Sequence, residues 1–184
     1  ERIAQTDTLK GLRKLSDELL RVRVLDPACG GGNFLYVAYR ELVNLEMEIL
    51  SKIHENFGER ARRSVGTASL VSTTQFFGID KDAFAVELAK VTMMLGKRLA
   101  LAEVEDTWFS RRDELPFEFE HPLPLDNLDT YIVCDDALFC DWPESRYIIG
   151  NPPYQSKNKM VEEFGREYVD RVRHKFEGVS GRVD

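Results

Sequence analysis

The chain has 184 residues, of which 43% are hydrophobic and 31% charged, a composition typical of an ordinary soluble domain with a core of its own. No apolar run approaches the roughly 18 residues of a membrane-spanning helix and no signal peptide is recognisable, so we expect a cytoplasmic protein without a membrane partner. A formal net charge of −7 argues against this chain alone gripping nucleic acid, because neutralising phosphates requires clustered lysine and arginine. The three cysteines show no CxxC spacing, which favours reduced thiols and no metal site.

The first half of the chain predicts two helices around a short strand. Leucines at helical spacing predict an amphipathic helix over about residues 7–20. The apolar residues Val22, Val24 and Leu25 predict a short strand, which the glycines of "DPACGGGNF" end. Helical spacing of apolar residues resumes over about 35–53, and the polar stretch over about 55–74 predicts a loop or a small excursion.

The second half predicts three further strands and two helices. "TQFFGID" predicts a strand, and Asp82 is placed to cap the helix that follows it. "ELPFEFEHPLPLDN" is rich in proline and acid and predicts a loop, whereas "TYIVCDD" and "RYIIGN" predict the third and fourth strands. The last helical pattern places four apolar or aromatic residues on one face: Val161, Phe164, Tyr168 and Val172.

Strands that alternate with helices predict a parallel sheet, in which ligands bind at the carboxyl ends of the strands. The four predicted strands run into Asp26 and the glycine loop, Asp80, the pair Asp135-Asp136, and Asn151. Any one of these residues could be explained by its structural role in a turn, where glycine, aspartate and asparagine are common. Four together at one edge indicate a binding site.

The residues at this edge indicate the kind of ligand. The glycine loop lacks the G-x-G-x-x-G spacing of dinucleotide-binding proteins, and the acid at its start would oppose a phosphate but suit an ammonium group. Asp80 is placed to accept hydrogen bonds from ribose hydroxyls. Asp136 is assigned to an adenine amino group, although Asp135 follows the same strand and a shift of register by one residue would exchange them. A ligand with an ammonium group, a ribose and an adenine but no phosphate is S-adenosylmethionine.

Four motifs carry a resemblance to a known family. "DPACGGGNFL" closely resembles the first cofactor motif of the γ-class DNA adenine-N6 methyltransferases, usually written DPACGSGNFL, and "GNPPY" matches their catalytic motif. "FFGIDKD" and "VCDDALF" occupy the second and third cofactor motifs. The chain looks most like the methyltransferase core of fused restriction–modification enzymes of type IIG/IIL. It departs from the family at Gly31, where a serine is usual, and in residues 1–21, where the family's N-terminal cofactor-binding segment is not recognisable.

This resemblance implies a Rossmann-like class I methyltransferase fold, of which the chain would hold only the first strands. Residues 1–21 would form an N-terminal helix leading into the core, and residues 22–184 a partial catalytic domain. Duplex DNA would bind through a target-recognition region outside this chain. The implied catalytic residues are Asn151, Pro152, Pro153 and Tyr154, and the implied cofactor-binding residues are Asp26, Pro27, Ala28, Cys29, Gly30, Gly32, Asn33, Phe34, Asp80, Lys81, Asp136 and Ala137.

The proline turn suits amine chemistry. An exocyclic adenine N6 is a poor nucleophile because its lone pair is delocalised into the ring. The Asn151 side-chain oxygen and the Pro152 carbonyl would accept hydrogen bonds from N6 and expose that lone pair to the methyl sulfonium. The prolines fix both acceptors in advance, and Tyr154 offers a flat face on which a flipped-out base can stack.

Three alternatives remain. N4-cytosine methylation uses the same chemistry, though those enzymes more often begin the turn with serine. Glutamine methylation of release factors also uses an Asn-Pro-Pro-Tyr turn, though its first motif usually lacks the Pro-Ala-Cys segment. A non-catalytic fragment that binds cofactor or serves as a scaffold is the third.

Overall fold

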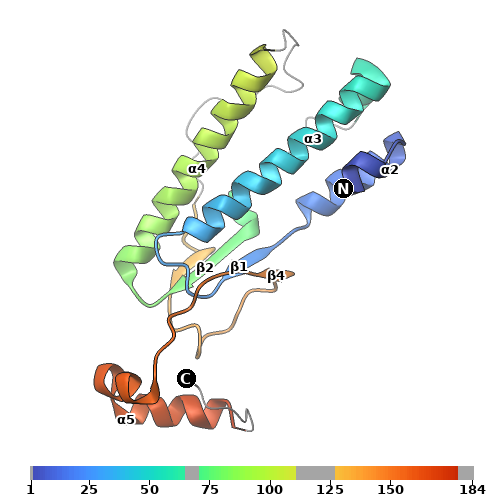
Figure 1. The fold of residues 1–184 in the computed structure, drawn as a ribbon. Helices are drawn as coiled ribbons and strands as arrows, with labels where there is room; N and C mark the ends of the chain where they lie inside the picture. The colour runs from blue at the N-terminus through green and yellow to red at the C-terminus, as the bar shows by residue number, and fades with distance from the viewer. Residues whose placement is uncertain (1, 65–70, 111–126, 178–184) are drawn as a thin grey trace.

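The computed structural model describes residues 2–64, 71–110 and 127–177 of the chain (Figure 1). Its strands form one parallel sheet in the order β3-β2-β1-β4. The parallel α/β architecture expected from the sequence is therefore confirmed. The elements in chain order are α1 (Arg2–Gln5), α2 (Leu9–Leu20), β1 (Val24–Asp26), α3 (Asn33–Ser64), the 3₁₀ turn η1 (Thr73–Gln75), β2 (Phe76–Asp80), α4 (Ala83–Ser110), β3 (Ile132–Cys134), β4 (Tyr147–Ile148) and α5 (Lys157–Lys175).

The strand order reverses between β1 and β4. From β1 the chain adds β2 and then β3 on one side, and it returns to the other side of β1 for β4. The helices α3 and α4, which connect the first three strands, lie together on one face of the sheet (Figure 1). Neighbouring strands whose connections run in opposite directions form a switch point, and ligands of open α/β sheets bind beside it.

The core forms on both faces of the two central strands. On the helix side, Val24 and Phe76 pack in a buried cluster with Leu35 and Met93 of α3 and α4. On the other side, Leu25, Phe77 and Ile79 form a second buried cluster. Burial on both faces explains why the sequence of these strands is continuously apolar rather than alternating.

The N-terminal helices pack against the distal half of α3. Leu12 of α2 is fully buried with Ile49 and Ile53 of α3. The Gln75 side chain donates hydrogen bonds to the carbonyls of Leu19 (3.1 Å) and Val22 (2.8 Å), and so binds the end of α2 to the start of β2. The Leu19 carbonyl also accepts the Val22 N–H (3.1 Å), so the amide adds a second hydrogen bond at this helix end.

Three sequence predictions need comment here. The predicted loop over 55–74 is wrong for residues 55–64, which continue α3 to Ser64 across a non-helical break at Gly58. Apolar residues become sparse in this segment, but Ala61 is still buried in the same cluster as Leu12 of α2. This packing favours continuation of the helix. Residues 65–70, and all but the last residue of "ELPFEFEHPLPLDN", lie outside the described residues. The predicted cap of α4 is confirmed, because Asp82 accepts a hydrogen bond from the Phe84 N–H (2.9 Å).

No helix in the described part of the chain is both long enough and apolar enough to cross a membrane.

A buried acid supports the entry into β2. Glu46 of α3 is 1% exposed, and its carboxylate accepts a hydrogen bond from the Val71 N–H (2.8 Å). Burial raises the pKa of Glu46 to about 7, although the hydrogen bond from Val71 opposes this effect. Between its ordinary pKa of 4.5 and about 7, the folded chain holds a proton that the unfolded chain releases. The free energy of unfolding therefore falls as the pH rises through this window.

Replacing Glu46 with glutamine should remove this pH dependence, because the amide keeps an acceptor for Val71 but cannot ionise. As the pH rises from about 4.5 to about 8, the free energy of unfolding of Glu46→Gln should increase by about 2–3 kcal/mol relative to that of the wild type. Urea unfolding at several pH values measures the difference. Glu48→Gln removes an exposed acid from the same helix and should show no such gain. Parallel pH profiles for the wild type and Glu46→Gln would contradict the assignment.

Candidate active site

The parallel register brings the ends of all the strands to one edge of the sheet. Asp26 pairs with Gly78, Asp80 pairs with Cys134, and Leu25 pairs with Ile148. The segments that follow these strands therefore lie side by side. The loops expected to carry the site meet at the switch point between β1 and β4 and along the neighbouring ends of β2 and β3.

The glycine loop has one closed side and one open side. Gly30 (φ 49°) and Gly32 (φ 83°) adopt left-handed backbone conformations, which side chains disfavour. A Cβ at Gly32 would lie 3.0 Å from the Cα of Ala89 in α4, so the loop is packed against that helix. A Cβ at Gly30 would meet no atom within 4 Å. A ligand can therefore approach the backbone at Gly30.

Asp80 fastens this loop to the end of β2. One of its carboxylate oxygens accepts the Gly30 N–H (2.8 Å) and the other accepts the Asp82 N–H (2.9 Å). The Cys29 N–H also donates to the Ile79 carbonyl (3.0 Å). Each carboxylate oxygen can accept a second hydrogen bond. The sequence predicted Asp80 as a ligand acceptor, but it gave no sign that this residue also holds the glycine loop.

Asp26 joins the glycine loop to the proline turn. Its side chain is fully buried, and Oδ1 accepts the Ala28 N–H (3.0 Å). Among the described residues, Oδ2 is buried without a hydrogen-bond partner. Burial raises the pKa of Asp26, and the charge of Asp80 adds to this effect while the Ala28 hydrogen bond opposes it.

Gly150 of the chain leaving β4 packs directly on this carboxylate. A Cβ at Gly150 would collide with Asp26 Oδ1, and the φ of 148° is also one that side chains rarely adopt. The position therefore requires glycine. The sequence contained the signal, a glycine immediately before Asn-Pro-Pro-Tyr, but only the fold shows that its neighbour is Asp26.

Cys29 lies in the core rather than on the open side of the loop. The residue is 5% exposed, and a Cβ at Gly78 would lie 2.9 Å from its sulfur. Burial raises the pKa of Cys29 to about 12, and the charges of Asp80 and Asp26 add to this effect. The thiol is therefore protonated at neutral pH and acts as a small packing group. The cofactor role predicted for Cys29 could involve only its backbone.

The acid after β3 is held by a cluster that reaches α5. Asp136 Oδ1 accepts the Leu138 N–H (3.0 Å). Oδ2 accepts the Tyr168 hydroxyl (2.9 Å) and the Lys81 ammonium (3.1 Å). Burial alone would raise the pKa of Asp136, but the hydrogen bonds from Leu138, Tyr168 and Lys81 outweigh it and lower the pKa. Asp135 is exposed and accepts the Asp136 N–H (2.7 Å).

The remaining predicted residues are mostly accessible. Tyr154 is 81% exposed, and the rest of the Asn151–Tyr154 turn is exposed and without regular secondary structure. In the first turn of α3, Asn33 and Phe34 are exposed, whereas Pro27, Ala28 and Ala137 are half-buried. Ligands can therefore reach both the turn and the glycine loop from solvent.

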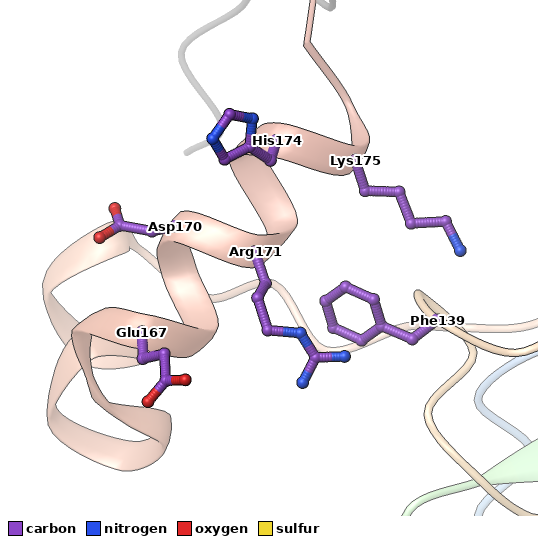
Figure 2. A pocket seen from close by; sticks show the side chains of 6 residues that line it. All are labelled: Phe139, Glu167, Asp170, Arg171, His174 and Lys175. Carbon is purple, nitrogen blue, oxygen red and sulfur yellow. The ribbon is translucent and has the colours of Figure 1, made fainter.

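A cleft at α5 and the loop that follows β3 lies next to this cluster (Figure 2). It is lined by Phe139, Glu167, Asp170, Arg171, His174 and Lys175. The Arg171 guanidinium lies over the Phe139 ring, 4.1 Å from its centroid. Phe139 also meets the Tyr168 ring edge to face at 5.5 Å. These contacts dock α5 against the loop that follows β3.

Residues 3–184 match the family model of the MmeI DNA-methyltransferase domain. The chain therefore belongs to this family of DNA-methyltransferase domains. The resemblance to the methyltransferase core of type IIG/IIL enzymes is confirmed.

Individual relatives agree with this assignment. The chain is 28% identical over 165 residues to DNA methyltransferase A of Bacillus subtilis (strain 168), covering 85% of the chain and 17% of the relative. It is 31% identical over 127 residues to a putative type II restriction enzyme and methyltransferase of Methanocaldococcus jannaschii, covering 69% of the chain and 9% of the relative.

A solved structure supports the fold. The type IIL restriction–modification enzyme MmeI in complex with DNA superimposes with a TM-score of 0.68 at 26% identity, over 87% of this chain and 22% of that one. The Rossmann-like methyltransferase fold is thereby confirmed. The chain spans less than a quarter of the length of each of these proteins.

The packing of the glycine loop gives a testable difference between two glycines. Gly32→Ala should lower the free energy of unfolding by about 2–4 kcal/mol, because it combines a disfavoured φ with a collision against α4. Gly30→Ala has the disfavoured φ without the collision and should cost about 1–2 kcal/mol. Urea unfolding followed by circular dichroism measures both. Equal losses would show that the loop is not packed on α4 as described.

Proposed function

We propose that this domain binds S-adenosylmethionine and transfers its methyl group to the N6 amino group of an adenine flipped out of duplex DNA. The observation that carries the proposal is the contact between Asp26 and Gly150. It sets the open glycine loop beside the Asn151–Tyr154 turn at the switch point of the sheet. Family membership adds support, since the matching domain is that of a DNA methyltransferase.

The glycine loop and the neighbouring acids fit such a cofactor. The buried Asp26 Oδ2, which has no partner among the described residues, is an acceptor suited to an ammonium group. The open side of Gly30 admits close approach to the backbone, and Asp80 keeps acceptor capacity for ribose hydroxyls. Asp136 is the acceptor that we assign to the adenine amino group. When bound, S-adenosylmethionine supplies an electrophilic methyl group on a sulfonium.

The proline turn would then activate the target amine. The Asn151 side-chain oxygen and the Pro152 carbonyl accept hydrogen bonds from N6, and this localises the nitrogen lone pair for direct attack. The two prolines hold the acceptors before the substrate arrives, so little ordering is needed during reaction. Tyr154, with its exposed ring, stacks on the flipped base.

We propose that duplex DNA is recognised largely outside these residues, by a target-recognition region. A net charge of −7 does not suit a surface that holds a phosphate backbone alone. The structural neighbour, of which this chain covers 22%, was solved in complex with DNA. That neighbour is a type IIL restriction–modification enzyme, which supports the same class of role for the protein that contains this domain.

Removing the Asp80 side chain should weaken S-adenosylmethionine. Asp80→Ala loses the ribose acceptor and the anchor of Gly30 together, and we expect affinity to fall by about 1–3 kcal/mol. Isothermal titration calorimetry on the full-length protein measures it. Asp82→Ala removes the same charge two residues away, where the carboxylate caps α4, and should leave affinity nearly unchanged. Equal affinities for Asp80→Ala and the wild type would rule out the ribose role.

Changing Asn151 should affect the transfer step and not cofactor binding. We expect Asn151→Ala to slow single-turnover methylation of duplex DNA by about 100-fold or more, since it removes one of the two acceptors fixed for the transition state. Cofactor affinity, measured separately, should stay near the wild-type value. Tyr154→Phe keeps the stacking ring and should remain largely active. Nucleoside analysis of the product identifies the methylated base, and a fully active Asn151→Ala enzyme would contradict the mechanism.

A further inference from the structure

The Tyr168 side chain of α5 reaches into the edge of the sheet that we assign to the cofactor. Its hydroxyl donates to Asp136 Oδ2 (2.9 Å) and lies 3.3 Å from the Lys81 ammonium. The Lys81 ammonium in turn lies 4.4 Å from the centroid of the Tyr168 ring and 4.1 Å from that of Phe164. The end of β2, the end of β3 and α5 are thus joined in one cluster.

The proposed function assigns one member of this cluster to the cofactor, and the family resemblance implies a cofactor role for a second. Asp136 is the acceptor for the adenine amino group, and Lys81 follows the acid assigned to the ribose. Tyr168 presents to them what an adenine would present: a flat aromatic ring and a hydrogen-bond donor at its rim. We propose that Tyr168 occupies the adenine position of the cofactor site, and that α5 is a gate which the cofactor must displace. This inference rests on the proposed function.

Tyr168 and an adenine amino group compete for the same acceptor. Asp136 Oδ2 already accepts both the Tyr168 hydroxyl and the Lys81 ammonium, whereas Oδ1 accepts the Leu138 N–H and keeps one acceptor position. The Asp136 side chain is only 19% exposed, so a ligand has restricted access to that remaining position on Oδ1. A further donor on Oδ2 would have to replace one of the two present. Tyr168, the neutral donor, is the weaker of them.

The connections of α5 suit a movable element. Residues 149–156, which join it to β4, have no regular secondary structure, and Gly165 (φ 82°) breaks the helix in the middle. In Figure 1 α5 lies apart from the helices that cover the sheet and is reached through an extended segment. Most of its described side chains are exposed, although Val169 is buried. Arg171 over Phe139 gives a second point of attachment beside Tyr168 (Figure 2).

The gate would couple two events at the site. If the cofactor must first displace Tyr168, only molecules in which α5 is undocked can bind it. The apparent affinity is then the intrinsic affinity multiplied by the undocked fraction. The Asn151–Tyr154 turn is covalently continuous with α5. Movement of the helix would therefore also shift this exposed turn, which we assign to the target base, when the cofactor enters.

The test compares Tyr168→Phe with the wild type in the full-length protein, using S-adenosylhomocysteine as the probe in calorimetry. The variant keeps the ring and the Lys81–Asp136 ion pair but loses the bond that closes the gate. We expect about fivefold tighter binding, the size of effect that loss of one hydrogen bond in the competing state produces. Tyr147→Phe makes the same change on β4, at the opposite edge of the sheet from β3, and should bind like the wild type.

Hydrogen–deuterium exchange gives a second measurement. Bound ligands usually slow exchange, whereas here the probe should speed exchange in residues 157–175 by undocking α5, while slowing it in the glycine loop. Equal or weaker binding by Tyr168→Phe, or slower exchange in α5 with the probe bound, would overturn the gate and leave the proposed cofactor in place. Absence of binding by the wild type and by both variants would overturn the cofactor assignment and the gate with it.

Discussion

The contact between the buried Asp26 carboxylate and the Gly150 backbone holds the two halves of the candidate site together. Asp26 ends β1 and begins the glycine loop, whereas Gly150 leads from β4 into the Asn-Pro-Pro-Tyr turn. Any side chain at position 150 would collide with the carboxylate and push β4 away from β1. β4 has only two residues in its ladder, and beyond it the Ile149 N–H donates to the Leu25 carbonyl (2.9 Å), which brings Gly150 directly against Asp26. A loop that can cradle a cofactor and a turn that can hold an amine are neighbours because this position has no side chain.

The acids at this edge are stabilised in three different ways. Asp80 accepts two backbone N–H groups, and Asp136 is paired with Lys81 and Tyr168. Asp26 has one backbone hydrogen bond, a buried oxygen without a partner in the described residues, and a raised pKa. A positively charged group close to Asp26 would relieve this imbalance, because an opposite charge favours the ionised form. The electrostatics therefore agree with a ligand that brings an ammonium or a sulfonium and no phosphate.

The prediction from sequence succeeded where the local sequence pattern and the tertiary packing favour the same secondary structure. Helical spacing in α2 and the cap at Asp82 are local features, and the apolar runs of β1 and β2 had to be strands because both faces are buried. It failed over 55–64, where α3 continues past sparse apolar spacing because Ala61 packs on the N-terminal helices. The cofactor role predicted for Cys29 stays a prediction, and the fold shows only that its side chain lies in the core. The motif fixes its position in the chain, but whether a thiol faces the core or a ligand depends on what packs beside it, here Gly78.

The sequence by itself determined the class of the protein and the residues at the strand ends, because motifs such as "DPACGGGNF" and "GNPPY" are contiguous and their chemistry is local. Tertiary structure alone decided which of these residues touch. The order β3-β2-β1-β4 puts β4 beside β1, and no periodicity in the chain encodes that pairing. The same holds for Tyr168, which as one of four residues on a predicted helical face looked like an ordinary packing residue. Its position against Asp136 depends on the direction in which α5 leaves the turn, and that direction is set by contacts between segments far apart in the chain.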